Sequence, residues 1–550
     1  MKHPTTDPSS PPSSLWERSS LVRFFRWLFS GRVLRRIVLG VAWVAALIAL
    51  AYGVENWRGR RAWNQYRTQL EARGVQLDLA ALIPAPVADD RNMADTPFIR
   101  SWFDRHTTWD KRWNDDFEIA EMPKRDPKAS PDGWQSVDLS QWAWSLQVAA
   151  NNRLESQKYP VRKSRAVDDS IIDAAFPSRA LAAAAVLEGL KSSEARLAEL
   201  REAGRRPEAR YPVVYDLNNP WGILLPHLGG VRRACLRLQV RACARLALND
   251  SAGALDDVLL SLTLVDSLKS EPFLISSLVR ISCMQIALQP VWEGLADRQW
   301  SDVQLSTLQT RLSSYDFLGD WNRSLEAERA AALLTADLIG RGTYRLSQLG
   351  HEAPSRPPDL WGEVFPDVAE RFAPRGWYQL EKVNYCRWLD RQTAGVLDEK
   401  ARRVSPVRIA ANTRELEDEI ASGRLYFGSF PGVLRHVLLA TQLLPGLSGL
   451  PLKMSSAQTA VEEAAIACAL ERYRLAEGSY PEALTALVPK FLAQLPTDLL
   501  TGKSYRYRRR DDGGFVLYSV GWNEKDDQGV PGKDPFDSVT GDWVWEYPKR

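Results

Sequence analysis

A run of 18 residues without a charged side chain, Ile37–Val54, is the feature that most limits how this chain can fold. At about 1.5 Å of rise per residue, a helix of this length spans roughly 27 Å, which is enough to cross the hydrocarbon core of a bilayer. A soluble helix would have to bury all of its faces, and no neighbouring segment is apolar enough to cover them. We therefore predict a transmembrane helix at residues 37–54.

A cleaved signal peptide is the main alternative, because Ala49-Leu50-Ala51 resembles a cleavage site. However, 36 residues precede the apolar run, and this is far longer than the usual basic region of a signal peptide. We therefore expect an uncleaved signal-anchor with a single membrane span.

Basic residues flank the apolar run, with seven in the preceding tail and five in the 20 residues that follow. The positive-inside rule places the more basic flank in the cytoplasm. Basic and aromatic side chains alternate over Leu15–Phe29, which is typical of a helix at a lipid interface. We expect the N-terminal tail to be cytoplasmic and the bulk of the chain to lie outside the inner membrane of a bacterium.

The segment after the membrane span is rich in aromatic residues. Trp57, Trp63 and Tyr66 are expected near the outer membrane interface, on a continuation of the same helix. Six tryptophans follow in an irregular stretch: Trp102, Trp109, Trp113, Trp134, Trp142 and Trp144. Such a cluster can stack on sugar rings, or it can fill a loop-rich core. Both interpretations remain open.

The middle of the chain has the periodicity of helices. Apolar residues recur at spacings of three and four through Gly229–Ser314, and Phe273–Trp292 is apolar on several faces. We expect the latter helix at the centre of a bundle, with Pro290 kinking or ending it. Helix pairs joined by short polar turns weakly resemble α-solenoid units, but no copy recurs at a fixed period.

Composition argues against several kinds of site. Lys plus Arg (71) nearly balances Asp plus Glu (68), so a broad nucleic-acid-binding surface is not expected. The five histidines are far apart in the sequence, which argues against a His-rich metal centre. The five cysteines form no CxxC pair. Cys235 and Cys243 lie about 12 Å apart along one predicted helix, too far for a disulfide, so we expect buried free thiols.

No catalytic residue is predicted. The chain lacks a nucleophile elbow, a phosphate-binding loop and a zinc-protease motif in a supporting context. Adjacent carboxylates such as Asp256-Asp257 are expected on solvated faces. His227 lies in a Gly- and Pro-rich turn before a helix, where a structural role is favoured over a catalytic one. We do not expect an enzyme.

From Ser455 the pattern changes. Ala457–Leu475 reads as an amphipathic helix that Gly478 ends, and two strand-like runs, Ser504–Arg508 and Phe515–Val520, follow. The turn residues between these runs suit a hairpin. We predict a helix packed on a small antiparallel sheet. Phe515, Leu517 and Tyr505 would cover Ala464, Cys468 and Leu475, unless Val516 and Tyr518 face inward instead.

Short motifs of this region occur in a distinctive order. They are Tyr473-Arg474-Leu475, Gly478, Tyr480-Pro481, Leu487-Val488-Pro489, Leu495-Pro496, Asp498, Thr501-Gly502 and Phe515–Gly521. This order resembles the C-terminal domain of the major pseudopilin of type II secretion systems, over roughly Ser455–Gly529. The chain departs from that family because its apolar helix lies about 400 residues upstream and lacks the processing site. We therefore do not expect pseudopilin-like processing or polymerisation.

Some pseudopilin domains bind calcium in the loop after the last strand. The matching loop, Trp522–Asp537, contains Asn523, Asp526 and Asp527, followed by Asp534 and Asp537. Hard oxygen ligands suit Ca²⁺, although the spacing is not that of an EF-hand. The resemblance thus implies a calcium site at Asn523, Asp526 and Asp527, and a solvated acidic loop without metal is the alternative. No other cofactor is expected.

The predicted fold class is mainly α, with a small C-terminal α+β module. The expected divisions are a basic tail with an interfacial helix (1–36), a membrane helix (37–54), a juxtamembrane helix with an irregular Trp-rich segment (55–165), an α-helical domain (166–454) and the pseudopilin-like module (455–550). The whole chain looks like uncharacterised bacterial membrane-anchored proteins of this layout.

The expected function is that of a non-enzymatic scaffold or interaction protein of the cell envelope, linked to secretion-type assemblies. Its partners would be the lipid bilayer and other envelope proteins. The alternative is a glycan- or peptidoglycan-binding or processing protein that uses the Trp-rich segment.

Overall fold

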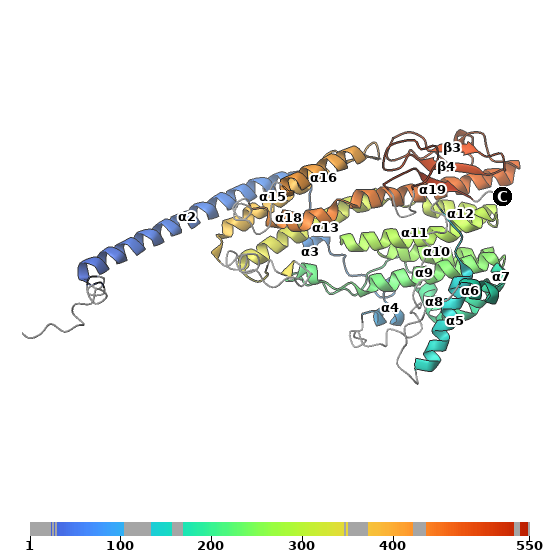
Figure 1. Ribbon diagram of the computed structural model, residues 1–550, viewed down its shortest axis with the longest axis horizontal. Coiled ribbons are helices and arrows are strands. Elements are labelled where there is room, and N and C mark those ends of the chain that lie inside the picture. The colour runs from blue at the N-terminus through green and yellow to red at the C-terminus, as the bar shows by residue number, and fades with distance from the viewer. Residues whose placement is uncertain are drawn as a thin grey trace, which may run out of the picture.

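The longest helix stands partly free of the rest of the molecule. In the computed structural model, α2 (Gly31–Ala72) is one unbroken helix of 42 residues, about 63 Å long (Figure 1). This helix, predicted from the sequence, is long and apolar enough to cross a membrane. Its most apolar 18-residue window is 0% buried in the body. In the part of the chain that the structure describes, α11 (Leu274–Ala296) is also long and apolar enough, but half of its window is buried inside the body. We assign α11 to the core.

The structure describes residues 24, 27, 30–103, 134–156, 169–345, 348–349, 372–421, 436–532 and 539–547. The remaining α-helices in this part are α3 (Leu79–Leu82), α4 (Pro97–Ser101), α5 (Leu139–Ser156), α6 (Asp169–Ala175), α7 (Arg179–Gly189), α8 (Glu194–Ala203), α9 (Pro226–Ala247), α10 (Ser251–Ser267), α12 (Asp302–Leu312), α13 (Phe317–Arg341), α15 (Arg375–Thr393), α16 (Pro406–Ala421), α18 (Leu438–Leu443) and α19 (Leu450–Glu477). Short 3₁₀ helices are η3 (Lys191–Ser193), η4 (Pro220–Gly222), η7 (Leu444–Leu447) and η8 (Leu484–Leu487). The strands are β1 (Leu397–Asp398), β2 (Arg403–Val404), β3 (Arg506–Arg509), β4 (Phe515–Ser519) and β5 (Trp543–Glu546). The predicted fold class is confirmed.

The helical bundle is built around α9, α10 and α11, which pack on one another. The side chain of Asp250 accepts the backbone N–H of Gly253 and so caps α10. Ser301 and Gln304 form a reciprocal capping box that begins α12. Pro290 neither ends nor divides α11, which continues to Ala296. The central position predicted for this helix is confirmed by its packing against α9, α10, α13 and α19.

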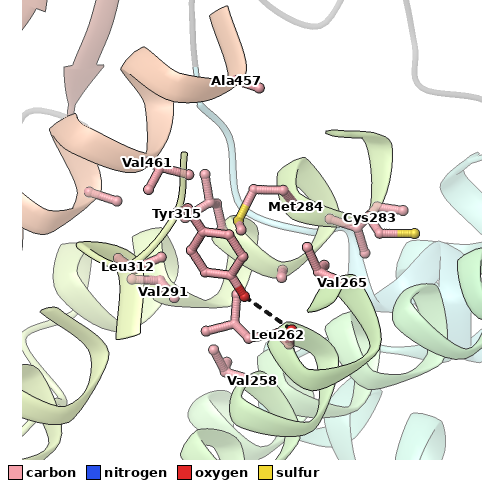
Figure 2. Packing of buried hydrophobic residues seen from close by; sticks show 14 of the residues in the cluster. Val258, Leu262, Val265, Cys283, Met284, Val291, Leu312, Tyr315, Ala457 and Val461 are labelled. Atoms are coloured by element: carbon pink, nitrogen blue, oxygen red, sulfur yellow. Dashed lines mark hydrogen bonds between the residues drawn. The ribbon is translucent and has the colours of Figure 1, made fainter. Parts of the chain in front are cut away.

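One hydrophobic cluster extends from the bundle into the C-terminal region. Figure 2 shows its centre, where side chains of α10, α11 and α12 meet Ala457 and Val461 of α19. Tyr315 lies among them and donates its hydroxyl to the carbonyl of Leu262, at 3.0 Å. The core therefore crosses the division expected at 454/455. Helix α19 belongs to the bundle as much as to the sheet.

The C-terminal sheet has three antiparallel strands in the order β3-β4-β5. The predicted hairpin is confirmed, with Arg509 paired to Phe515. The expectation that β4 is the last strand is wrong, because β5 pairs with it and places Trp545 opposite Leu517. Strand β5 begins at Trp543, far along the chain from the end of β4 at Ser519, so local turn chemistry gave no sign of its partner.

The two faces of this sheet pack differently. Phe515 and Leu517 are fully buried in the same cluster as Ala464 and Cys468, as expected for the face toward α19. Val516, Tyr518 and Val544 form a separate small cluster. Leu475 was wrongly assigned to the packing face, since it is 46% exposed. Gly478, with φ at 82°, ends α19 in the left-handed conformation that glycine adopts most easily.

The cysteines fit the expectation from the sequence. All five are free and buried. Cys235 and Cys243 both lie on α9, where desolvation raises the pKa of the Cys243 thiol well above its usual value. These thiols act as small core residues.

The shared core predicts a cooperative effect of a buried charge on α19. Replacing the fully buried Ala464 with Asp places a carboxylate where apolar side chains from the bundle and the sheet meet. Burying an unpaired charge costs several kcal/mol. We expect Ala464→Asp to lower the melting temperature of the whole body, measured by far-UV circular dichroism of the full chain.

Ala476→Asp is the matched control, because Ala476 is exposed on the same helix. This control should melt like the unchanged chain. If Ala464→Asp also melted like the unchanged chain, the shared core would be wrong.

Candidate functional site

The acidic loop near the C-terminus is held by internal hydrogen bonds. Asp542, which is 2% exposed, accepts the backbone N–H of Asp527 at 3.1 Å and that of Gly529 at 2.6 Å. Asp526 accepts the hydroxyl of Tyr518 at 3.1 Å and the guanidinium of Arg506 at 3.3 Å. The backbone N–H of Gln528 helps to hold the pKa of Asp526 below its usual value.

The calcium site stays a prediction. Asn523 donates its amide to Asp527 at 3.0 Å, so the structure does bring these two predicted ligands together. Lys525 also lies 3.5 Å from Asp527. Within the described residues, no three His, Cys, Asp or Glu side chains gather closely enough to hold a metal ion. Asp534 and Asp537 lie outside the described residues.

His227 is a buried structural histidine. It is 0% exposed and lies between the rings of Phe103 and Tyr211, with centroids 5.4 and 4.2 Å away. Its Nε2 is 2.5 Å from Glu271, whose other oxygen accepts the hydroxyl of Ser276. The contact joins the start of α9 to the segment before α11. The structural role favoured by the sequence is therefore the one that its surroundings support.

Asp257 corrects the expectation that adjacent carboxylates lie on solvated faces. Its side chain is 0% exposed and accepts Arg245 at 3.0 Å, while Arg241 approaches to 3.4 Å. Burial raises the pKa of Asp257 to about 6, although these guanidinium groups act to lower it. The cluster joins α10 to α9 and is part of the bundle's packing.

The main candidate site is the junction between α2 and α15, formed around Gly59, Trp63, Gly376 and Asp390, which we call the anchor junction. In it the backbones of the two helices touch at Gly59 and Gly376. A Cβ atom on Gly59 would collide with the carbonyl of Gly376, and one on Gly376 would collide with the carbonyl of Glu55. The side chain of Asn56 accepts the backbone N–H of Gly376 at 2.7 Å. Only glycine at both positions allows this approach.

Near the C-terminal end of α15, Asp390 accepts hydrogen bonds from three side chains of the anchor junction. Tyr66 and Arg73 of α2 donate to one of its oxygens at 3.0 and 2.9 Å. Arg329 of α13 donates to the other oxygen at 2.8 Å. Burial, aided by the charge of Asp390, raises the pKa of Tyr66 to about 12. One carboxylate thus ties α2 to two helices of the body.

Trp63 and Lys382 meet between the Gly59–Gly376 contact and Asp390 in the anchor junction. The Lys382 ammonium lies 4.4 Å from the centre of the Trp63 ring and 2.7 Å from Asp337 of α13. A cation over an aromatic face is attracted by the ring quadrupole. Burial lowers the pKa of Lys382, an effect that Asp337 opposes.

Two aromatic residues of α2, Trp63 and Tyr66, do not lie at the outer membrane interface where the sequence predicted them. Trp63 is only 8% exposed and Tyr66 donates to Asp390, so both face the body and not a membrane interface. Trp57 is 63% exposed, and its place at a membrane interface stays a prediction. Gly59, in the charged half of α2, was the one local indication that another helix packs closely here. Its partner lies 317 residues away, so no spacing rule could identify it.

Glu381 occupies a buried position next to the anchor junction. Its two oxygens accept the backbone N–H groups of Leu438 and Leu439 at 3.1 and 3.2 Å, at the start of α18. Burial nevertheless raises the pKa of Glu381 to about 7. Its position on α15 links the protonation of this carboxyl to the stability of the body.

Comparison with protein-family models, curated proteins and solved structures found no match for this chain. Its interpretation therefore rests on the geometry described above.

The raised pKa of Glu381 predicts a loss of stability as pH rises. Below a pH of about 4.5 the Glu381 carboxyl is protonated in both the folded and the unfolded chain, so it adds no pH dependence to the unfolding free energy. Between 4.5 and about 7 only the folded state keeps the proton, so the unfolding free energy falls. This difference in pKa corresponds to roughly 3 kcal/mol. Glu381→Gln should make the chemical-unfolding midpoint less dependent on pH across this range, as followed by tryptophan fluorescence in detergent.

Glu417→Gln is the control, because Glu417 is exposed on α16. It should leave the pH dependence unchanged. A Glu381→Gln chain with the pH dependence of the unchanged protein would contradict the burial of a proton-binding carboxyl at this site.

Proposed function

We propose that this protein is a single-pass, membrane-anchored scaffold of the cell envelope, without enzymatic activity of its own. In this proposal α2 crosses the bilayer and holds the helical body and its C-terminal sheet for contacts with other envelope proteins. The observation that carries the proposal is the course of α2. Its most apolar 18-residue window is 0% buried in the body, while its polar half packs against α15 without a break in the helix.

The anchor junction supports a positioning role. A flexible tether would keep a protein near a membrane but would leave its orientation free. Here the helix that leaves the apolar span is the same helix that touches Gly376 and donates to Asp390. Packed helices with hydrogen-bonded contacts resist bending. The direction of the span then fixes the direction of the body, which suits a scaffold.

The C-terminal sheet lies toward the end of the body opposite the free end of α2 (Figure 1). The resemblance of this region to a pseudopilin domain supports the proposal that it meets components of a secretion-type assembly. We further propose that the N-terminus lies in the cytoplasm and the body lies outside the inner membrane of a bacterium. The larger number of basic residues before the span supports this orientation.

The glycan-binding alternative gains no support from the described tryptophans. Trp102 and Trp142 are 5% and 8% exposed, and both belong to hydrophobic clusters. Trp134 packs against Trp545, with ring centroids 5.0 Å apart. Trp109 and Trp113 lie outside the described residues. Core packing accounts for Trp102, Trp134 and Trp142.

The proposal predicts that charges in the apolar half of α2 release the chain from the membrane. Val44 and Leu47 are 56% and 60% exposed. An Arg near the middle of a span costs about 2.5–3.5 kcal/mol for insertion. We expect Val44→Arg with Leu47→Arg to move the chain from the carbonate-resistant membrane fraction to the soluble fraction. Cross-linking in intact cells should give adducts heavier than the 62.0 kDa chain, and these should be lost with the anchor.

Val303→Arg serves as the control, since Val303 is 74% exposed on α12 and should tolerate a charge. Recovery of the unchanged chain in the soluble fraction would rule out the anchor. Membrane-bound chain without cross-linked partners would rule out the scaffold.

A further inference from the structure

The start of α15 lies beside the apolar half of α2. The two helices run in the same direction, because their contacts follow the same order along both. Tyr52 donates its hydroxyl to the carbonyl of Phe372, Gly59 then meets Gly376, and Tyr66 meets Asp390. The N-terminal end of α15 therefore points along α2 toward the apolar span.

The depth of Phe372 follows from its contact with Tyr52. Tyr52 belongs to the apolar run of residues 37–54. Side chains on a helix lean toward its N-terminus, so the Tyr52 hydroxyl lies over the turn before its own Cα. The carbonyl of Phe372 is thus at the level of residues that α2 would place inside the membrane. Phe372 itself is 65% exposed. A large apolar side chain therefore stands at the depth of the span without cover from the described residues.

Basic residues follow at the next level. Arg375 at the first position of α15 is exposed, and so are Arg58, Arg60 and Arg61 on α2. Glu55 is the acid nearest to them on α2, and it lies 3.2 Å from Arg58. Phe372 would thus lie at the depth of the acyl chains and the arginines at the depth of the headgroups. The ring can enter the acyl boundary while the guanidinium groups meet lipid phosphates.

We propose that the tip of α15 is a second membrane-contact surface, with Phe372 in the acyl boundary and Arg375 at the phosphates of anionic lipid headgroups. The inference rests on the proposed membrane anchoring by α2. It adds that the body itself sits on the leaflet from which α2 emerges. Two contacts of different chemistry, one spanning and one peripheral, then define the tilt of the body.

Spin labels on the full chain in nanodiscs test this surface. Phe372→Cys can be labelled selectively, because the five native cysteines are buried. The nanodiscs contain phosphatidylcholine and phosphatidylglycerol, and the readout is the ratio of label collisions with oxygen to those with a water-soluble nickel complex. Leu47→Cys in the apolar half of α2 is the lipid reference, and Val303→Cys on α12 is the aqueous reference. We expect the ratio at position 372 to lie near the lipid reference and several-fold above the aqueous one.

The possible outcomes separate this inference from the proposed function. A lipid-like ratio at position 47 with an aqueous ratio at position 372 would overturn the second contact and leave the anchor intact. An aqueous ratio at position 47 would overturn both.

Charge reversal tests the phosphate contact with the same label at position 372. Arg375→Glu should lower the ratio several-fold in nanodiscs that contain phosphatidylglycerol, because a carboxylate repels the anionic surface. Arg414→Glu is the control, since Arg414 is exposed on α16. An equal ratio in the two charge-reversal variants would overturn the assignment of Arg375 to the phosphate layer.

Discussion

The backbone contact between Gly59 and Gly376 sets the position of α2, with its apolar half, relative to the rest of the body. With any larger residue at either place, α2 and α15 would have to separate, because the colliding atoms belong to the backbone. The polar contacts of the junction depend on the same approach. Asn56 reaches the N–H of Gly376, and Asp390 joins donors from α2 and α13. A small change in one helix spacing would therefore disturb several bonds together.

A second helix, α19, has a comparable role at the other end of the body. It packs against α11, α12 and α13 and also carries the three-stranded sheet. The sheet is too small to be stable alone, so it relies on a helix that the bundle already holds. The C-terminal sheet is thus built into the body, and a force on the sheet would reach the bundle through α19.

The sequence predicted the elements whose signals are local. The helices expected within Gly229–Ser314 are present as α9, α10, α11 and α12. Of the two faces of β4 that the sequence left open, the structure turns Phe515 and Leu517 toward α19. Strand β5, the inward direction of Trp63 and the three donors of Asp390 were missed. Periodicity shows that a helix has a buried face but does not identify what covers it. The contacts of Asp390 join residues up to 324 positions apart, so only the fold brings them together.

A distance measurement across the anchor junction tests the central claim most directly. One spin label replaces Leu47 in the apolar half of α2, and the other replaces Val407, which is 66% exposed on α16. Double electron–electron resonance on the full chain in nanodiscs should give one narrow distance distribution, which Gly59→Leu should broaden. A broad distribution in the unchanged chain would contradict a rigid junction between α2 and the body.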